Sequence, residues 1–103
     1  FFSGDTKPVD VIIEKAKCCD ILVHEAYCAA GMPHVPERWQ WYFPTVHTSG
    51  IEVGEVAAKV NPGLLILNHQ MCFGGTTDAD LIQEVRDGGF EGEVVSGQDL
   101  QLF

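Results

Sequence analysis

The sequence predicts an α/β fold in which helices flank a largely parallel sheet. Short apolar runs alternate along the chain with segments whose apolar residues recur at helical spacing. Nearly half of the 103 residues (46%) are hydrophobic, which is enough to build a real core. Alternating strands and helices favour a parallel sheet, and ligands of such sheets gather beyond the carboxyl ends of the strands. Polar side chains that directly follow a predicted strand are therefore candidates for a functional site.

The chain opens on what we interpret as the end of a strand. Two phenylalanines run into a Ser-Gly-Asp-Thr turn at positions 3–6, where Gly4 permits a tight turn. Asp5 is then either a carboxylate at the carboxyl end of the strand or a simple capping residue. A helix is expected over residues 7–17, whose apolar residues have helical spacing, with Thr6 as its cap.

The second strand is expected at residues 21–23, an Ile-Leu-Val run followed by the polar pair His24 and Glu25. Regular patterning fails over residues 27–46, where one glycine and three prolines interrupt an aromatic-rich stretch. We expect a long loop there, whose aromatic residues either wall a pocket or pack the loop onto the body. His34, within this loop, is expected to be an ordinary surface histidine. The aromatic residues of this predicted loop are Trp39, Trp41, Tyr42 and Phe43.

Two further helices are expected in the second half of the chain. The first covers residues 51–60, with Thr48 or Ser49 as its cap and His47 just before it. The second covers residues 78–86, where a Gly-Gly pair follows the last helical turn.

The third predicted strand is the Leu-Leu-Ile-Leu run at residues 64–67, which an Asn-Pro-Gly stop separates from the preceding helix. His69 follows this strand closely. Residues 92–103 contain two apolar runs around a turn-like Ser-Gly-Gln-Asp, and we expect strand, turn and strand there.

Composition narrows the classes of function. Fifteen acidic against six basic side chains give a formal charge of −9, which argues against a general electrostatic grip on nucleic acid. No stretch is long enough to cross a bilayer and no signal peptide is visible, so a cytoplasmic location is expected. The four cysteines form no C-x-x-C motif, and we expect reduced, mostly buried thiols. A redox role for Cys18 and Cys19 is a weaker possibility.

The residues after the strands suit metal chemistry. A carboxylate with imidazoles is a donor set for zinc, manganese or iron, so Asp5 and His69 could bind a metal together with further ligands. A catalytic zinc commonly takes three protein ligands, so these two would form only part of a site. His47 could act as a general acid or bind an anion, with Glu25 orienting its ring. Taken singly, each histidine is more simply a core or capping residue.

Four motifs resemble, in order, the second half of the metallo-β-lactamase superfamily. They are Phe-Ser-Gly-Asp-Thr at 2–6, Asp-Ile-Leu-Val-His-Glu-Ala at 20–26, His-Thr-Ser at 47–49 and Leu-Ile-Leu-Asn-His at 65–69. The chain is most similar to the branch that contains RNase Z and arylsulfatase-like hydrolases, and the resemblance covers essentially the whole chain. It implies the C-terminal half of one αββα sandwich domain over residues 1–103, with a mixed sheet and flanking helices.

The resemblance also implies roles for individual residues. Asp5 matches the aspartate that bridges two metal ions, and His69 matches the last histidine ligand of one of them. Glu25 and His47 match a catalytic pair in which the glutamate supports a histidine near the scissile group. His24 would lie behind these groups as a supporting or structural residue.

The resemblance implies that this chain is half of a binuclear metal-dependent hydrolase, which cleaves an ester by means of metal-activated water. The ester would be a phosphodiester, a sulfate ester or a related small ester. The cofactors would be two divalent metal ions, for which zinc is preferred and manganese or iron are the alternatives. The family's His-x-His-x-Asp-His motif lies in the other half of the fold, so this chain alone is expected to be inactive. His-Thr-Ser and His-Glu-Ala-Tyr stand where RNase Z often has His-Ser-Thr and His-Glu-Ala-Thr, which favours a small ester over RNA. The alternative is a noncatalytic half-domain that needs a complementary chain or self-associates.

Overall fold

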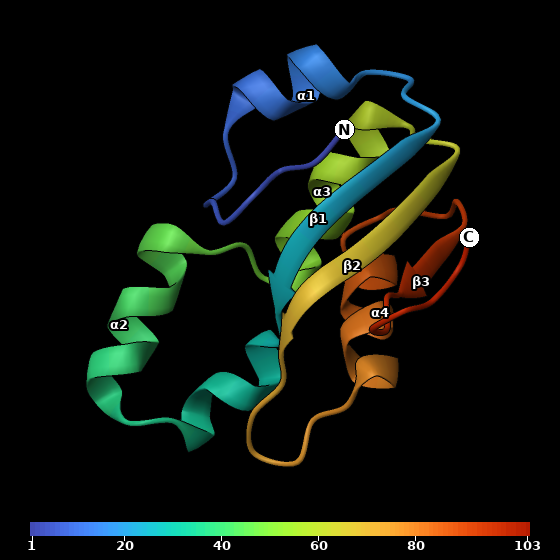
Figure 1. Ribbon diagram of the computed structural model, residues 1–103. Coiled ribbons are helices and arrows are strands. Elements are labelled where there is room, and N and C mark those ends of the chain that lie inside the picture. Colours follow the sequence, from blue (N-terminus) through green and yellow to red (C-terminus); the bar gives the residue numbers. More distant parts are fainter.

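The computed structural model describes all 103 residues and shows a three-stranded sheet with helices packed against it (Figure 1). The strand order is β1-β2-β3 and both pairs are parallel, so the predicted α/β fold is confirmed. No antiparallel pair occurs, and the sheet of this chain is parallel rather than mixed. In chain order the elements are α1 (Asp10–Ala16), β1 (Ile21–Tyr27), the 3-10 helix η1 (Ala29–His34), α2 (Glu37–Val46), α3 (Gly50–Val60), β2 (Leu64–Met71), α4 (Asp78–Asp87) and β3 (Val94–Ser96).

The core lies between one face of the sheet and the helices α1, α3 and α4. Strand residues of alternate positions, such as Leu22 and Leu65, are fully buried there against helical residues such as Val53. The close packing of α3 against α4 depends on Gly54 and Gly88, because a Cβ at either position would lie 2.1 Å from a carbonyl oxygen of the other helix's segment. In the view of Figure 1, α3 and α4 lie behind the strands, and α2 extends away from the sheet.

The outer edge of β1 carries two short parallel bridges. Phe2 pairs with Val23 near the start of the strand, and Ser49 pairs with Tyr27 at its end. The segments that precede Asp5 and follow His47 in the chain are therefore held beside the same strand.

Both long strands extend further than predicted. β1 continues to Tyr27, so His24 and Glu25 lie within the strand and not beyond it, and β2 continues to Met71 and includes His69. The reason is that backbone pairing does not require apolar side chains: His24 and Glu25 continue the ladder opposite Leu67 and Asn68.

Residues 27–46 do not form the predicted loop, because they contain the end of β1, η1 and α2. The prolines predict a break in regular structure, but Pro36 precedes the first turn of α2 and Pro44 lies in its last turn. Between them, Trp39 and Phe43 recur at helical spacing, with ring centroids 6.2 Å apart.

The ends of the chain also differ from expectation. The first helix begins at Asp10 rather than near residue 7, and Thr6 does not cap it, because its hydroxyl donates to the carbonyl of Lys7. The last apolar run forms no strand: no sheet edge pairs with residues 100–103, and Leu100 and Leu102 are almost fully exposed.

Ser49 caps α3 through a reciprocal pair of bonds with Glu52, as predicted from its hydroxyl. All four cysteines are free, but only Cys28 is buried and Cys18 is exposed, so the expectation of mostly buried thiols was wrong. No helix has the length and apolar character needed to span a membrane.

Candidate metal centre

Three side chains from distant parts of the sequence meet at one edge of the molecule. Asp5, His47 and His69 each present one potential metal-binding atom, and these atoms all lie within 4.8 Å of one another. Asp5 comes from the turn after the first bridge, His47 from the link between α2 and α3, and His69 from β2. The side chain of His47 is 12% exposed, whereas those of Asp5 and His69 are 63% and 49% exposed, so the cluster is open to solvent on one side.

His69 reaches this cluster because β2 carries a bulge there. Glu25 of β1 pairs with Asn68 and the next residue, Ala26, pairs with Gln70, so His69 has no partner of its own. Its φ of 45° is in the left-handed region, which non-glycine residues adopt rarely. Bulges re-aim a side chain out of the regular alternation, and here the His69 Nδ1 lies 3.1 Å from the Oδ1 of Asp5.

Asp5 is positioned by the backbone on both sides of it. Before it, the amide of Ser3 donates to the carbonyl of Val23, and Gly4 turns the chain away from the strand with a φ of 65°. After it, the amide of Thr6 donates to the carboxylate of Glu25 at 3.2 Å.

The carboxylate of Glu25 connects the Asp5 turn to the His47 segment. It is 1% exposed, and its Oε1 accepts from the amide of Thr6 at 3.2 Å, the amide of Thr48 at 3.1 Å and the Nδ1 of His47 at 3.2 Å. The Thr48 hydroxyl also donates to the carbonyl of Thr6 at 2.6 Å. Burial raises the pKa of Glu25, while the amides and His47 oppose that shift by favouring the charged form. With Nδ1–H donated to Glu25, the Nε2 of His47 is left for another partner.

His24 lies on the other face of β1, among the helix-side residues, and takes no part in the cluster. Its ring is fully buried, its Nδ1 lies 2.8 Å from the carbonyl oxygen of Glu25, and its Nε2 has no partner. Burial lowers its pKa, and the bond to Glu25 partly opposes this. His34, as expected, is exposed at the surface.

Two supporting residues were not found from the sequence. Glu84 of α4 is 7% exposed and accepts from the amides of Ala29 and Ala30, both at 2.9 Å, which anchors η1 to the body. Phe73 packs its ring 5.3 Å from that of Phe43. An acid in a polar helix and a phenylalanine in a glycine-rich loop carry no sequence signal for these contacts.

The donor set fits a divalent cation. A carboxylate and two imidazoles are ligands that zinc, manganese and iron accept, and a carboxylate lies against the Nδ1 of each ring. The carboxylate beside His47 is Glu25, which is outside the donor set and orients the ring, whereas the carboxylate beside His69 is Asp5, itself a member of the donor set.

Comparisons with known proteins find ribonuclease Z proteins and uncharacterized proteins among the relatives. No family model matches the sequence. The chain is 32% identical over 98 residues to the ribonuclease Z of Haloarcula marismortui, covering 95% of this chain and 29% of that protein. It is 34% identical over 68 residues to the zinc phosphodiesterase ELAC protein 2 homolog of Caenorhabditis elegans, covering 66% of this chain and 7% of that protein. The crystal structure of the metallo-β-lactamase fold protein YhfI from Bacillus subtilis matches with a TM-score of 0.71 at 23% identity, over 94% of this chain and 36% of that one.

Replacing Glu25 tests whether its carboxylate connects the Asp5 turn to the His47 segment. Glu25→Ala leaves the amides of Thr6 and Thr48 without an acceptor, so both should exchange with deuterium much faster, and stability should fall by about 2 to 3 kcal/mol. Amide exchange read by NMR and urea unfolding measure the two effects. Glu25→Gln keeps one acceptor oxygen and should lose less, and Glu14→Ala, at an exposed position of α1, is the control. Unchanged exchange at both threonines in Glu25→Ala would contradict the assignment.

Proposed function

Because this chain belongs to the metallo-β-lactamase superfamily, we propose that it forms part of a metal-dependent hydrolase and carries one side of its metal centre. The observation that supports this most directly is the convergence of Asp5, His47 and His69 within 4.8 Å. We assign Asp5 and His69 as ligands and His47, supported by Glu25, as a proton donor. Two divalent ions, zinc first, are the proposed cofactors of the whole site, and when bound they would activate water and stabilise negative charge on the ester.

The His47 side chain suits delivery of a proton. Hydrolysis of a phosphodiester forms a bond from the water oxygen to phosphorus and breaks the bond to the leaving oxygen, which then takes up a proton. Glu25 holds the Nδ1 of His47, so the Nε2 of the protonated ring can give its proton to that oxygen. The carboxylate of Glu25 stabilises the charged ring before transfer and keeps it oriented.

A phosphodiester is the ester that the comparisons favour. The names of the relatives refer to a ribonuclease and to a zinc phosphodiesterase, and none of them refers to a sulfate ester. We propose a small phosphodiester in preference to RNA, because a formal charge of −9 gives no general attraction for a long polyanion.

We further propose that residues 1–103 are the C-terminal part of one metallo-β-lactamase-like domain. The chain spans less than a third of the length of the ribonuclease Z that it matches. The sheet face away from the helices also carries apolar side chains that stay exposed at its β1 edge, although Val23 and Ile66 in the middle of that face are only 9% and 8% exposed. Ile21 is 41% exposed there, and Phe2, the bridge partner of Val23 on that face, is 76% exposed. The other part of the domain would cover this face and supply the remaining ligands.

The same face supports a second candidate, a noncatalytic half-domain that pairs with another chain or with its own copy. The uncovered apolar surface is its motivation, because such a surface favours association. In both candidates the sheet face is an interface, and they differ in whether the assembled protein binds metal and hydrolyses an ester.

Metal binding separates the proposed roles of the three clustered residues. In the intact protein, which contains the other part of the domain, Asp5→Ala and His69→Ala should each lower zinc content and affinity by about tenfold or more and abolish hydrolysis of bis(4-nitrophenyl) phosphate. His47→Ala should keep the metal and lose turnover by about 100-fold. Metal analysis and kcat measurements give both quantities, with His34→Ala as the control. Unchanged metal content and activity in Asp5→Ala would overturn its assignment, and loss of metal in His47→Ala would make His47 a ligand.

The sheet-face interface predicts association of the 103-residue chain. Analytical ultracentrifugation should find dimers or larger species, and Phe2→Asp combined with Ile21→Asp should shift them toward monomer because a buried charge opposes contact. Val11→Asp is the matched control, since Val11 is 53% exposed but belongs to α1. A monomer that unfolds cooperatively without any partner would contradict both the interface and the half-domain candidate.

A further inference from the structure

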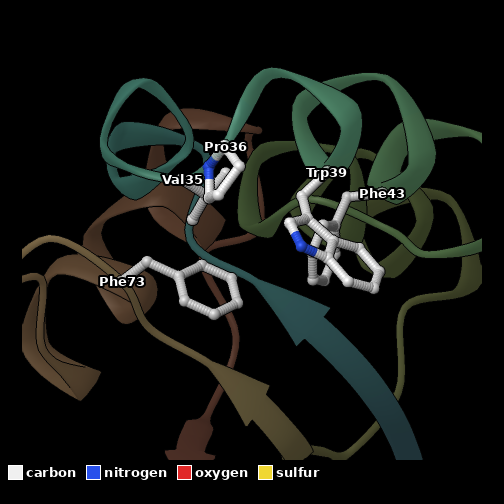
Figure 2. A pocket seen from close by; sticks show the side chains of 5 residues that line it. All are labelled: Val35, Pro36, Trp39, Phe43 and Phe73. Atoms are coloured by element: carbon white, nitrogen blue, oxygen red, sulfur yellow. The ribbon is translucent and has the colours of Figure 1, made fainter.

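A cavity lined by apolar side chains lies beside the candidate metal centre. Its volume is about 390 Å³, and its walls come from the link between η1 and α2, from α2 itself and from the loop after β2. Figure 2 shows the ring of Phe73 on one side of the space and the rings of Trp39 and Phe43 on the other. The lining residues are Val35, Pro36, Trp39, Phe43 and Phe73.

The cavity and the metal centre share a wall. The Phe43 ring, which lines the cavity, lies 5.4 Å from the ring of His47, with 34° between their planes. The His47 ring in turn lies 5.7 Å from that of His69. A group bound against the Phe43 ring would therefore be separated from the His47 ring by that one side chain.

Resting on the function proposed above, we propose that this cavity binds a planar aromatic ring carried by the phosphodiester substrate. Its volume is at the small end of the range for ligand sites, which suits a ring and not a whole large ligand. Trp39 is 40% exposed although it is a large apolar ring, so one side of the cavity wall is free to contact a ligand. Three of the five lining side chains are aromatic, and rings pair with rings more favourably than area alone accounts for.

An aryl group and a nucleobase both present the planar aromatic face that this cavity is proposed to bind. The lining offers one indole N–H and otherwise only hydrocarbon, so the cavity would recognise the face of a ring and not the hydrogen-bonding edge of a particular base. The ester's phosphorus would lie toward His47 and its ring toward Phe73.

The test compares phosphoryl ligands that carry a ring with one that carries only a methyl group. Isothermal titration of the zinc-loaded protein with phenylphosphonate, methylphosphonate and adenosine monophosphate should give affinities about tenfold higher for a ring-bearing ligand than for methylphosphonate. The phenyl and adenosine arms tell which source of ring the cavity prefers, and a preference for either one supports the proposal. Equal affinity for all three, or no binding, would overturn it.

Substitutions of the lining residues test where the ring of the ligand binds. Trp39→Ala should remove most of the preference for ring-bearing ligands, and Phe73→Leu, which keeps the apolar volume but not the ring, should reduce it. Trp41→Ala is the control, because Trp41 is on the same helix, is 74% exposed and does not line the cavity. Equal loss in Trp39→Ala and Trp41→Ala would contradict the assignment of the site.

Zinc titration of the same samples separates this proposal from the function on which it rests. Ring preference that depends on Trp39 without zinc binding would leave the cavity assigned and overturn the metal centre. Zinc binding without a preference for ring-bearing ligands would support the metal centre and overturn the proposal for the cavity.

Discussion

The buried carboxylate of Glu25 is the constraint on which the candidate site depends. The outer edge of β1 is paired at two places, and between them Glu25 accepts from the amides of the two flanking segments. One oxygen atom therefore sets the distance between the Asp5 turn and the His47 segment. A carboxylate that is 1% exposed is costly to bury, and three donors on its Oε1 offset part of that cost, while its Oε2 has no hydrogen-bond partner.

The opposite side of the site depends on backbone geometry. His69 occupies the bulge in β2 with a φ of 45°, and its ring meets Asp5 at 3.1 Å. A strained residue at an exposed polar cluster is more typical of a functional site than of a stabilising one. The packed sheet fixes Glu25, the bulge fixes His69, and the more exposed residues between them provide the donors. The site thus combines a rigid base with a rim that remains open to solvent.

The sequence predicted the order of strands and helices better than their ends. The runs at 21–23 and 64–67 located both long strands, and the hydroxyl before residue 50 located the start of α3. The bulge at His69 could not be predicted, because it is a difference in pairing between two strands and leaves no local pattern. The prolines made α2 hard to predict. Pro36 precedes the first turn, where a helix has no use for the N–H, whereas Pro44 lies in the last turn and removes one N–H bond there without ending the helix early. The parallel sheet brings the ends of β1 and β2 to one edge, which the sequence predicted, but the bulge that turns His69 toward Asp5 and the bonds through Glu25 required the side-chain and pairing geometry.

A zinc titration that follows the ¹⁵N resonances of the four histidine rings tests the central claim most directly. The account predicts a saturable shift at His69 and a smaller response at neighbouring His47, with no change at buried His24 or exposed His34. It also predicts that Glu25→Ala weakens the zinc affinity by about tenfold or more, because the turn that carries Asp5 loses the bond from the Thr6 amide to Glu25. An unresponsive His69 ring, or the same affinity in Glu25→Ala as in the unaltered chain, would contradict it.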